Sequence, residues 1–396
     1  MTSIPKLGTM LNQLIGKPSV SCVHPDIDMS NLTVISALAE WLESMGYQTT
    51  VSTLPDQTKN QPQKANLVAV LYPENVEPEE DGSIHGGLIL AGHTDTVPFD
   101  ESLWNSNPLA ITEKDNRFYG LGTCDMKAFF AIALEAISRY KSSDLKKPLI
   151  LVATADEEST MDGARLLVEQ NKLHADYALI GEPTNLKPVR MHKGMMSDAI
   201  IINGQSGHSS NPELGASALE GMQSVMQDLL QWRTQLQQQY KDPAFTVPVP
   251  TMNFGHIHGG DNPNRICGSC ELHFDFRCLP GMSQTELRQQ IKEITARSLR
   301  NTPLTFEYKI LFQGIPAFET NTDSDIVQLT ESLSGHSAHS VAFGTEAPFF
   351  QQLQCETIIL GPGSIDQAHQ ANEYLSHDQI KPMIKLIQQL VEKTCL

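Results

Sequence analysis

The sequence predicts an α/β protein with a mixed sheet flanked by helices, into which a smaller two-layer α+β module is inserted. Two observations support this class. Short apolar runs that are typical of buried strands alternate with amphipathic helical patterns over much of the chain. Between 191 and 312 the pattern changes to alternating strands and polar helices. We therefore expect one domain from 1–190 and 313–396, and an inserted domain at 191–312.

The first strand of interest is the apolar run Leu88 to Asp95, which follows two glycines and ends in an imidazole and a carboxylate. A run without polar alternation is typical of a central strand that is covered on both faces. His93 and Asp95 are two residues apart, so they project in the same sense from the end of that strand. In open α/β sheets this edge is where ligands bind.

Similar runs recur along the first domain. Asn31 to Met45 has the apolar spacing of a helix. Four strands are expected after it, at Leu67 to Leu71, Leu149 to Ala153, Tyr177 to Ile180 and Thr357 to Leu360. A polar loop is expected at 73–87, and a last helix around 380–391. Three of these strands end in or near further polar groups, namely the Glu157–Glu158 pair, Glu182 and His369.

Asp125 lies between a glycine-containing stretch, 118–127, and a helical pattern at 128–140. A carboxylate in this position is favoured by the free amides of the first helical turn. A helix cap is therefore the simplest interpretation of Asp125 taken alone.

The inserted module has the element order β-α-β-β-α-β, which is typical of a compact unit with an antiparallel sheet. The expected segments are strands at 198–203, 251–257, 270–276 and 304–311, with helices at 216–236 and 284–299.

Composition restricts the class of partner. The chain has 396 residues, with 28 Lys and Arg against 46 Asp and Glu, a formal net charge of −18. Such an excess repels nucleic acid and anionic membranes and attracts cations. No apolar stretch reaches the length of a membrane span, and no targeting segment is evident. We expect a cytoplasmic protein that binds neither nucleic acid nor membranes, with its seven scattered cysteines reduced.

The candidate metal ligands are His93, Asp125, Glu158, Glu182 and His369. Two imidazoles and three carboxylates form a donor set that zinc accepts, and cobalt or manganese would also suit it. With one carboxylate shared, five ligands would hold two ions about 3.5–4 Å apart, as in hydrolases with a dinuclear centre.

Two carboxylates beside the ligands have different expected roles. Asp95 is placed to hold the second ring nitrogen of His93. Glu157, next to the ligand Glu158, is placed to move a proton as a general acid and base. The simpler interpretation of Glu157 is an exposed acid at the start of a helix.

The residues of five segments, and the order of these segments along the chain, resemble the motifs of the dinuclear zinc deacylase and peptidase family. The segments are Ala-Gly-His-Thr-Asp-Thr-Val-Pro, Gly-Leu-Gly-Thr-Cys-Asp-Met-Lys, Ala-Asp-Glu-Glu, Gly-Glu-Pro-Thr and Gly-Gln-Ser-Gly-His-Ser-Ser. The resemblance covers nearly the whole chain. It implies a zinc-peptidase-like catalytic domain, two Zn²⁺ ions bridged by Asp125, an inserted lid that forms a homodimer, and His208 as a donor to the oxyanion.

The same resemblance implies removal of an acyl group from an amino acid, with a related aminoacylase or dipeptidase, or a succinyl-diaminopimelate desuccinylase, as the alternative. Glu346 replaces an arginine of relatives whose substrates carry a distal carboxylate, which suits a substrate with a positive end group. Thr345 lies beside it. Arg265 is a candidate for the α-carboxylate, with Asn264 assisting. An ordinary lid salt bridge is the simpler explanation of Arg265 and of Glu346.

Cysteine chemistry is a second possibility. Cys124 precedes Asp125, and Cys267 and Cys270 form a C-x-x-C pair. No second pair with zinc-site spacing is evident, and the pair leads into a strand, so we favour ordinary buried thiols. His256 and His258 alternate along an expected strand, and solvated or hydrogen-bonded side chains explain them best. A non-catalytic metal-binding protein would be expected to lack Glu157 or a ligand, and this chain has all of them.

Overall fold

The computed structural model describes residues 4–55 and 62–396 and divides into two compact units. The first unit comprises the described residues up to Arg190, together with Thr320–His339 and Thr345–Leu396. The second comprises Met191–Glu319 and Ser340–Gly344. The inserted segment of the sequence thus forms a compact unit of its own. It ends later than the expected 312 and includes five residues from a second pass of the chain.

The first unit is built on a mixed sheet in the order β1-β2-β7-β4-β9-β17-β10. Its strands are β1 (Gln48–Thr53), β2 (Ala65–Leu71), β4 (Leu88–His93), β7 (Leu149–Thr154), β9 (Tyr177–Ile180), β17 (Glu356–Ile359) and the first half of β10 (Val189–His192). The four central strands, β7, β4, β9 and β17, are parallel. The predicted strands are therefore confirmed within a residue or two at each end.

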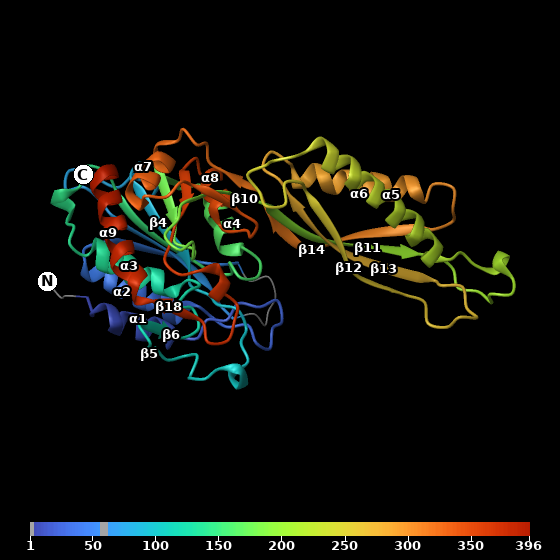
Figure 1. Ribbon diagram of the computed structural model, residues 1–396, viewed down its shortest axis with the longest axis horizontal. Helices are drawn as coiled ribbons and strands as arrows, with labels where there is room; N and C mark the ends of the chain where they lie inside the picture. The colour runs from blue at the N-terminus through green and yellow to red at the C-terminus, as the bar shows by residue number, and fades with distance from the viewer. Residues whose placement is uncertain (1–3, 56–61) are drawn as a thin grey trace. The chain divides into compact units, whose positions relative to one another are not determined.

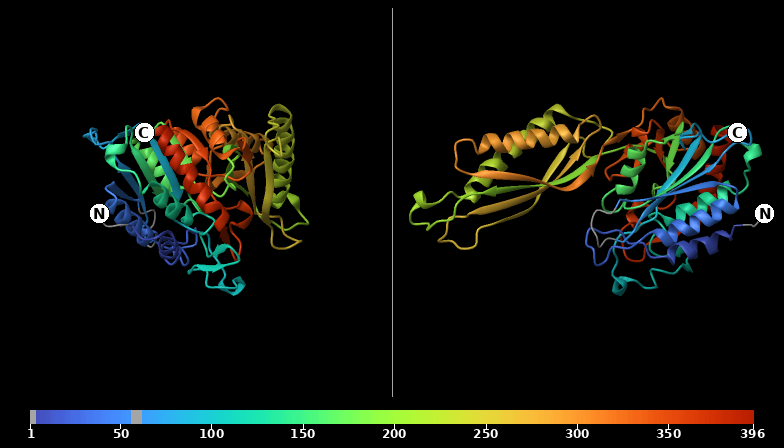
Figure 2. Two further views of the ribbon diagram at one scale, coloured as in Figure 1. Left: turned by 60° about the vertical axis from the view of Figure 1, so that its left-hand side comes forward. Right: turned by 180° about the vertical axis from the view of Figure 1, so that it is seen from behind.

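Helices cover both faces of this sheet (Figures 1 and 2). They are α1 (Leu7–Ile15), α2 (Leu32–Ser44), α3 (Lys127–Ile137), α4 (Asp162–Gln170), α7 (Asp325–Ser334), α8 (Ala347–Gln352) and α9 (His377–Thr394). Because both faces are covered, every residue of β4 and of β7 is buried. This is why their sequences show no polar alternation.

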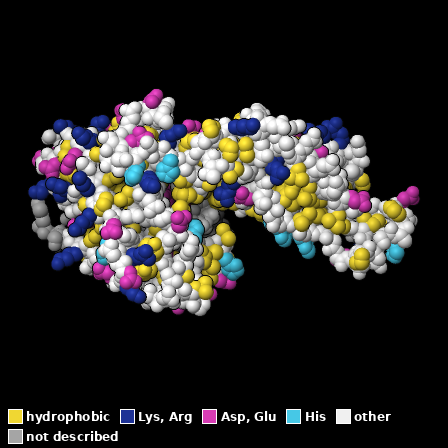
Figure 3. All heavy atoms as spheres, in the orientation of Figure 1, with side chains coloured by type: hydrophobic (Ala, Val, Ile, Leu, Met, Phe, Trp, Pro, Cys, Tyr) yellow, Lys and Arg dark blue, Asp and Glu magenta, His cyan; other side chains and the backbone are white. Residues whose placement is uncertain are grey.

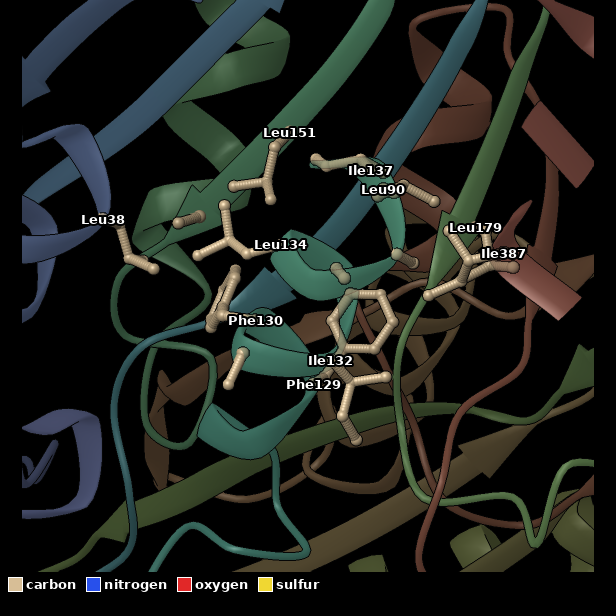
Figure 4. Packing of buried hydrophobic residues seen from close by; sticks show 14 of the residues in the cluster. Leu38, Leu90, Phe129, Phe130, Ile132, Leu134, Ile137, Leu151, Leu179 and Ile387 are labelled. Carbon is tan, nitrogen blue, oxygen red and sulfur yellow. The ribbon is translucent and has the colours of Figure 1, made fainter. Parts of the chain in front are cut away.

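The core of the first unit surrounds α3. Figure 4 shows Phe129, Phe130 and Ile132 of this helix among leucines of the strands and Ile387 of α9. Ten of the eleven residues of α3 are buried, so the helix is a central one. Its burial places the residues just before it, including Asp125, close to the end of β4.

Small sheets complete the first unit. They are formed by β5 (Thr112–Lys114), β6 (Arg117–Tyr119) and β18 (Tyr374–Ser376), and by β3 (Ile84–His85) with β8 (Leu173–His174). The polar loop expected at 73–87 is interrupted near its end by β3, which pairs in parallel with β8. The sequence signal was too short to reveal a two-residue strand.

The second unit has the predicted β-α-β-β-α-β order. Its elements are β11 (Gly194–Asn203), α5 (Ala218–Gln239), β12 (Thr251–Gly259), β13 (Ser269–Cys278), α6 (Gln284–Ser298) and β14 (Thr305–Ile315). The sheet order is β12-β13-β11-β14, and all three pairings are antiparallel. Alternate residues of β13 are buried against the helices, as expected for a sheet that is covered on one face.

Short strands lie near the points where the chain passes between the units. These are the second half of β10, β15 (Phe318–Glu319) and β16 (His339–Val341). In the described part of the chain, no helix combines the length and the apolar character that a membrane span requires.

Candidate metal centre

Three parallel strands bring candidate ligands to one edge of the first sheet. His93 is the last residue of β4, Glu182 follows β9 by two residues, and Glu158 lies in the turn after β7. The carboxyl ends of parallel strands meet at one edge, so these side chains converge although they are far apart in the sequence. Asp125 and His369 join them from loops.

The predicted ligands form two groups that share Asp125. His93, Asp125 and Glu182 make one group, and Asp125, Glu158 and His369 make the other, with ligand atoms within 4.8 Å of one another in each. A third group of this kind joins His93 with Glu157 and Glu158. The two-group arrangement is the one expected for a dinuclear centre with one bridging carboxylate.

The two oxygens of Asp125 face different histidines. Oδ1 lies 3.0 Å from Nε2 of His93, and Oδ2 lies 3.5 Å from Nε2 of His369. Nε2 of His93 is also 3.9 Å from Oε1 of Glu182, and Nε2 of His369 is 3.0 Å from Oε2 of Glu158. Each half of the centre therefore contains one imidazole, one carboxylate and one oxygen of Asp125.

Asp125 is not a helix cap. The N-terminal cap residue of α3 is Met126, and no side chain caps that end of the helix. The simplest interpretation of Asp125 was therefore wrong, because its carboxylate is turned towards the two histidines instead of the first helical turn.

Burial and charge at the centre suit a divalent cation. Burial raises the pKa of Glu157 and of Glu182 well above the usual range, and nearby carboxylates raise both further. Hydrogen bonds to Asp125 and Glu158 raise the pKa of His369 to about 10. Oε1 of Glu182 is buried and has no hydrogen-bond partner. Residues of these types, packed with excess negative charge, fit a metal centre.

Asp95 lies beside Nδ1 of His93, as expected from the sequence, and it also contacts Glu158. Nδ1 of His93 is 3.0 Å from the backbone oxygen of Asp95 and 3.6 Å from its carboxylate. The main chain therefore orients the His93 ring. The carboxylate also accepts a hydrogen bond of 3.0 Å from the backbone N–H of Glu158.

Glu157 lies in a turn and not at the start of a helix. Backbone N–H groups of 159, 160 and 161 donate to the carbonyl of Asp156, and α4 begins only at Asp162. Glu157 is partly buried and belongs to the group formed with His93 and Glu158. The interpretation as an exposed helix-start acid was therefore wrong.

A buried ion-pair cluster holds the turn that carries Glu157 and Glu158. Nζ of Lys64 lies 2.6 Å from Oδ1 of Asp28 and also contacts Asp156, and Ser21 donates to Asp156 at 2.7 Å. Asp156 has a φ of 62°, a conformation that few residues other than glycine adopt without support. Sequence reasoning missed Lys64 because nothing local distinguishes it from a surface lysine.

Sequence reasoning also missed Glu373. It is 2 % exposed, and its carboxylate accepts hydrogen bonds from the backbone N–H groups of Gly122, Cys124 and Asp125. Its position four residues after His369, directly before the short strand β18, is the only signal that the sequence offers.

Glu346 is buried in the first unit. Oε2 accepts a hydrogen bond of 2.9 Å from Thr154, while Oε1 has no partner, and burial raises the pKa of Glu346 to about 7. No described cation pairs with Glu346, so the lid salt bridge considered for it is not found. Because the side chain is fully covered, contact with a substrate would require it to move. Thr345, also buried, accepts a hydrogen bond from the N–H of Ala347.

His208, Asn264 and Arg265 lie together in the second unit. His208 forms an antiparallel bridge with Arg265, and the N–H of Ser209 donates to the carbonyl of Asn264. Nδ1 of His208 accepts the backbone N–H of Ser210 at 3.2 Å, which places the proton of the neutral ring on Nε2. Arg265 forms an exposed ion pair of 2.6 Å with Asp261.

The cysteines are buried thiols or partly buried ones, and all seven are free. Burial raises the pKa of Cys124 well above its usual value and that of Cys270 to about 11. A thiolate is therefore disfavoured at Cys124 and Cys270. His256 and His258 are exposed on β12, and the ring of His256 packs 4.8 Å from that of His273.

Comparison with known proteins agrees with this geometry. Residues 89–393 match the family described as Peptidase family M20/M25/M40. The chain is 46% identical over 392 residues to the acetylornithine deacetylase of Yersinia pseudotuberculosis, covering 99% of this chain and 98% of that one. It is 45% identical over 395 residues to the acetylornithine deacetylase of Pasteurella multocida, covering 100% of both.

Solved structures show the same fold. An M20 family metallo-carboxypeptidase from Sulfolobus solfataricus matches with a TM-score of 0.72 at 17% identity, covering 98% of this chain and 99% of that one. A dinuclear metal binding peptidase from Bacillus subtilis matches with a TM-score of 0.63 at 12% identity, covering 98% of both. The chain is therefore a metal-dependent hydrolase that belongs to peptidase family M20/M25/M40.

Proposed function

We propose that this chain hydrolyses the acetyl amide bond of N2-acetylornithine, releasing acetate and ornithine, with two divalent metal ions. Zinc is the first candidate, and cobalt or manganese also suits the ligands. The observation that carries the proposal is the pair of ligand groups that share Asp125. The acyl substrate is supported by full-length relatives that are named acetylornithine deacetylase.

Five residues would hold the two ions, with Asp125 common to both groups: His93, Asp125, Glu158, Glu182 and His369. Metal ions bound there supply polarisation of the amide carbonyl and a water of lowered pKa. Glu157 would take a proton from that water as its oxygen adds to the acetyl carbonyl, and would deliver the proton to the α-nitrogen as the C–N bond breaks. Asp95 holds the backbone of Glu158 in place through the hydrogen bond described above.

We assign the stabilisation of the developing oxyanion to His208. This role requires an imidazole N–H donor, and the hydrogen bond from Ser210 to Nδ1 leaves Nε2 protonated. For the substrate, Arg265 and Asn264 are proposed to bind the α-carboxylate. Glu346, assisted by Thr345, is proposed to bind the δ-ammonium.

Two further proposals concern the molecule as a whole. We propose a homodimer formed through the second unit, where α5 and β12 expose apolar side chains. The surface is lined by Leu219, Met222, Gln223, Met226, Gln227, Leu230 and Ile257, around a hollow of about 450 Å³. We also propose a cytoplasmic location, in keeping with seven free cysteines.

The decisive experiment is a zinc titration of the metal-stripped protein with N2-acetylornithine as substrate. Released ornithine and bound zinc per chain are measured together. We expect activity to rise with zinc until about two ions are bound. Two bound ions without ornithine release would preserve the centre and reject the substrate. In that case, profiles over other acetylated amino acids, dipeptides and succinyl-diaminopimelate would identify the alternative.

The substrate contact of Glu346 has its own test. Glu346→Gln should lower kcat/KM for N2-acetylornithine about 10-fold to 100-fold, because a hydrogen bond between charged groups is lost. The same variant should change kcat/KM much less for N-acetylmethionine, which has no ammonium on its side chain. Equal losses for both substrates would reject the proposed contact.

A further inference from the structure

The carboxylate of Glu373 accepts hydrogen bonds from the backbone of the loop that carries Asp125. Oε1 of Glu373 lies 2.6 Å from the backbone nitrogen of Cys124 and 2.9 Å from that of Asp125, and Oε2 lies 3.0 Å from that of Gly122. The backbone N–H of Gly120 also donates to the carbonyl of Glu373, at 3.1 Å. Four hydrogen bonds therefore tie one residue to one six-residue loop.

The loop is shaped to surround a carboxylate. Gly122 has a φ of 82°, in the left-handed region, and a side chain there would meet Cδ of Lys127 at 2.9 Å. Successive N–H groups in such a turn point into a common concavity, an arrangement that binds anions. Here a buried side chain of the same protein occupies the concavity, so the loop conformation depends on that side chain.

His369 contacts the carboxylate of Asp125, and Glu373 contacts its backbone. His369 lies 3.5 Å from the carboxylate oxygen Oδ2 of Asp125, while Glu373 accepts the backbone N–H of the same residue. Only three residues separate His369 from Glu373 in the sequence. This short segment therefore sets both the position of one metal ligand and the backbone of the shared one.

We propose that Glu373 is a positioning residue for the dinuclear centre, which holds Asp125 so that its two oxygens face the two metal sites. The proposal rests on the proposed metal centre and adds a residue that touches neither metal nor substrate. Because Asp125 belongs to both ligand groups, loss of this support weakens both sites. Loss of a ligand of one group, such as Glu182, weakens one site first.

The test compares metal binding by the full-length protein and by Glu373→Gln. Glutamine preserves the size of the side chain but has only one acceptor oxygen, so at least one N–H of the loop loses its partner. Substitution of groups that orient metal ligands commonly lowers metal affinity about 10-fold to 100-fold. In a calorimetric zinc titration of the variant, we expect the zinc affinity of both sites to fall by this factor. The absorption spectrum of the cobalt-loaded variant should change, and its activity should recover at higher zinc concentration.

Two control variants separate positioning from general stability. Tyr140→Phe removes a hydrogen bond of 3.1 Å from a largely buried hydroxyl to the carbonyl of Gln388, in the same unit. Asp100→Ala removes a carboxylate that accepts a backbone N–H at an exposed turn. Both should bind zinc with wild-type affinity, and Tyr140→Phe should lower the melting temperature.

The outcomes are distinct. Weakening of both sites in Glu373→Gln, with unchanged affinity in the controls, supports the proposal. Wild-type affinity and an unchanged cobalt spectrum in a folded Glu373→Gln variant overturn it and leave the centre intact. Failure of the wild-type protein to bind two ions overturns the centre itself, together with the role of Glu373.

Discussion

The carboxylates around the metal centre differ in the groups that they contact. Asp125 is engaged by two histidines, and Oδ2 of Asp95 accepts a backbone N–H. Glu157 differs, since no hydrogen bond to its carboxylate is found within the described ranges. A side chain that moves a proton must be free to change partners. Glu157 has the freedom that the proton transfer requires.

Replacement of Glu157 should therefore separate chemistry from metal binding. Glu157→Gln is expected to bind two zinc ions per chain and to lose at least about 10²-fold to 10⁴-fold in kcat, because a general acid–base group contributes that much. Metal content and steady-state kinetics on the same sample provide the check. Near-wild-type turnover in the fully loaded variant would reject Glu157 as the base.

His192 is a buried imidazole with a structural role in the second unit. It is 0 % exposed, its Nδ1 lies 2.9 Å from the carbonyl of Lys193, and its ring packs against Phe318. Burial lowers the pKa of His192 from 6.5 to about 4. The folded protein therefore keeps His192 neutral at a pH where the unfolded chain binds a proton.

This difference predicts an acid-sensitive second unit. Between pH 6.5 and 4 the unfolded chain binds more protons, so stability is highest above pH 6.5 and is lost as pH falls towards 4. A pKa difference of about 2.5, at about 1.36 kcal/mol per pKa unit, corresponds to about 3 kcal/mol. His192→Gln should remove this part of the pH dependence, as measured by urea unfolding at pH 7.5 and 4.5. Parallel pH profiles for the variant and the wild type would contradict the assignment.

At the scale of elements, the centre depends on close packing between α3 and the strand ends. Gly181 separates β9 from Glu182, and a Cβ at this position would lie 2.3 Å from ring atoms of Phe129. The ring is buried and rigidly packed, so it cannot move aside at little cost. The glycine allows the strand end, and with it Glu182, to lie directly against α3.

Gly181→Ala is therefore expected to destabilise the protein by about 1–3 kcal/mol, since it overpacks the core. It should also weaken metal binding, because Glu182 follows directly. Gly8→Ala is the matched control. Gly8 lies in α1, and no neighbouring atom lies within 4 Å of the added Cβ. Helix propensity therefore predicts that the free energy of unfolding rises by up to about 1 kcal/mol. Urea unfolding curves of both variants give the two changes in the free energy of unfolding. Equal changes for Gly181→Ala and Gly8→Ala would refute the packing argument.

At the scale of the whole molecule, the proposed dimer surface is an exposed apolar region of the second unit. Figure 3 shows hydrophobic side chains at the surface in the area that Figure 1 labels α5 and β12. Ile257 is 50 % exposed, and Leu219 and Leu230 are 42 % and 36 % exposed. Monomeric proteins rarely expose such side chains as one patch, so a second copy of the chain is the proposed occupant.

A charge placed in this patch should dissociate the dimer. Leu230→Asp is expected to sediment as a monomer at concentrations where the wild-type protein sediments as a dimer, because a buried unpaired carboxylate is costly. Leu103→Asp is the control, since Leu103 is 63 % exposed in the first unit. Sedimentation velocity decides the question, and a monomeric wild-type protein would reject the proposed dimer.

The sequence by itself determined the fold class and the buried central strands, and it indicated the candidate ligands at their ends. These features have a local signature, because a strand covered on both faces must be apolar throughout, and each polar ending then stands out against it. His93, Glu158 and Glu182 were recognisable for this reason. The order of elements in the inserted segment was equally local, because helical and strand periodicities differ.

Only the tertiary structure decided which oxygen of Asp125 faces which histidine, and that the main chain of Asp95 orients His93. It also revealed Glu373 and Lys64, whose roles depend on partners 36 to 251 residues away. Such contacts arise when sheet formation and the packing of α3 bring distant loops together, and no local pattern encodes them. Sequence periodicity records which side of an element is buried, whereas the atoms that a buried group meets are set by the packing of the whole unit.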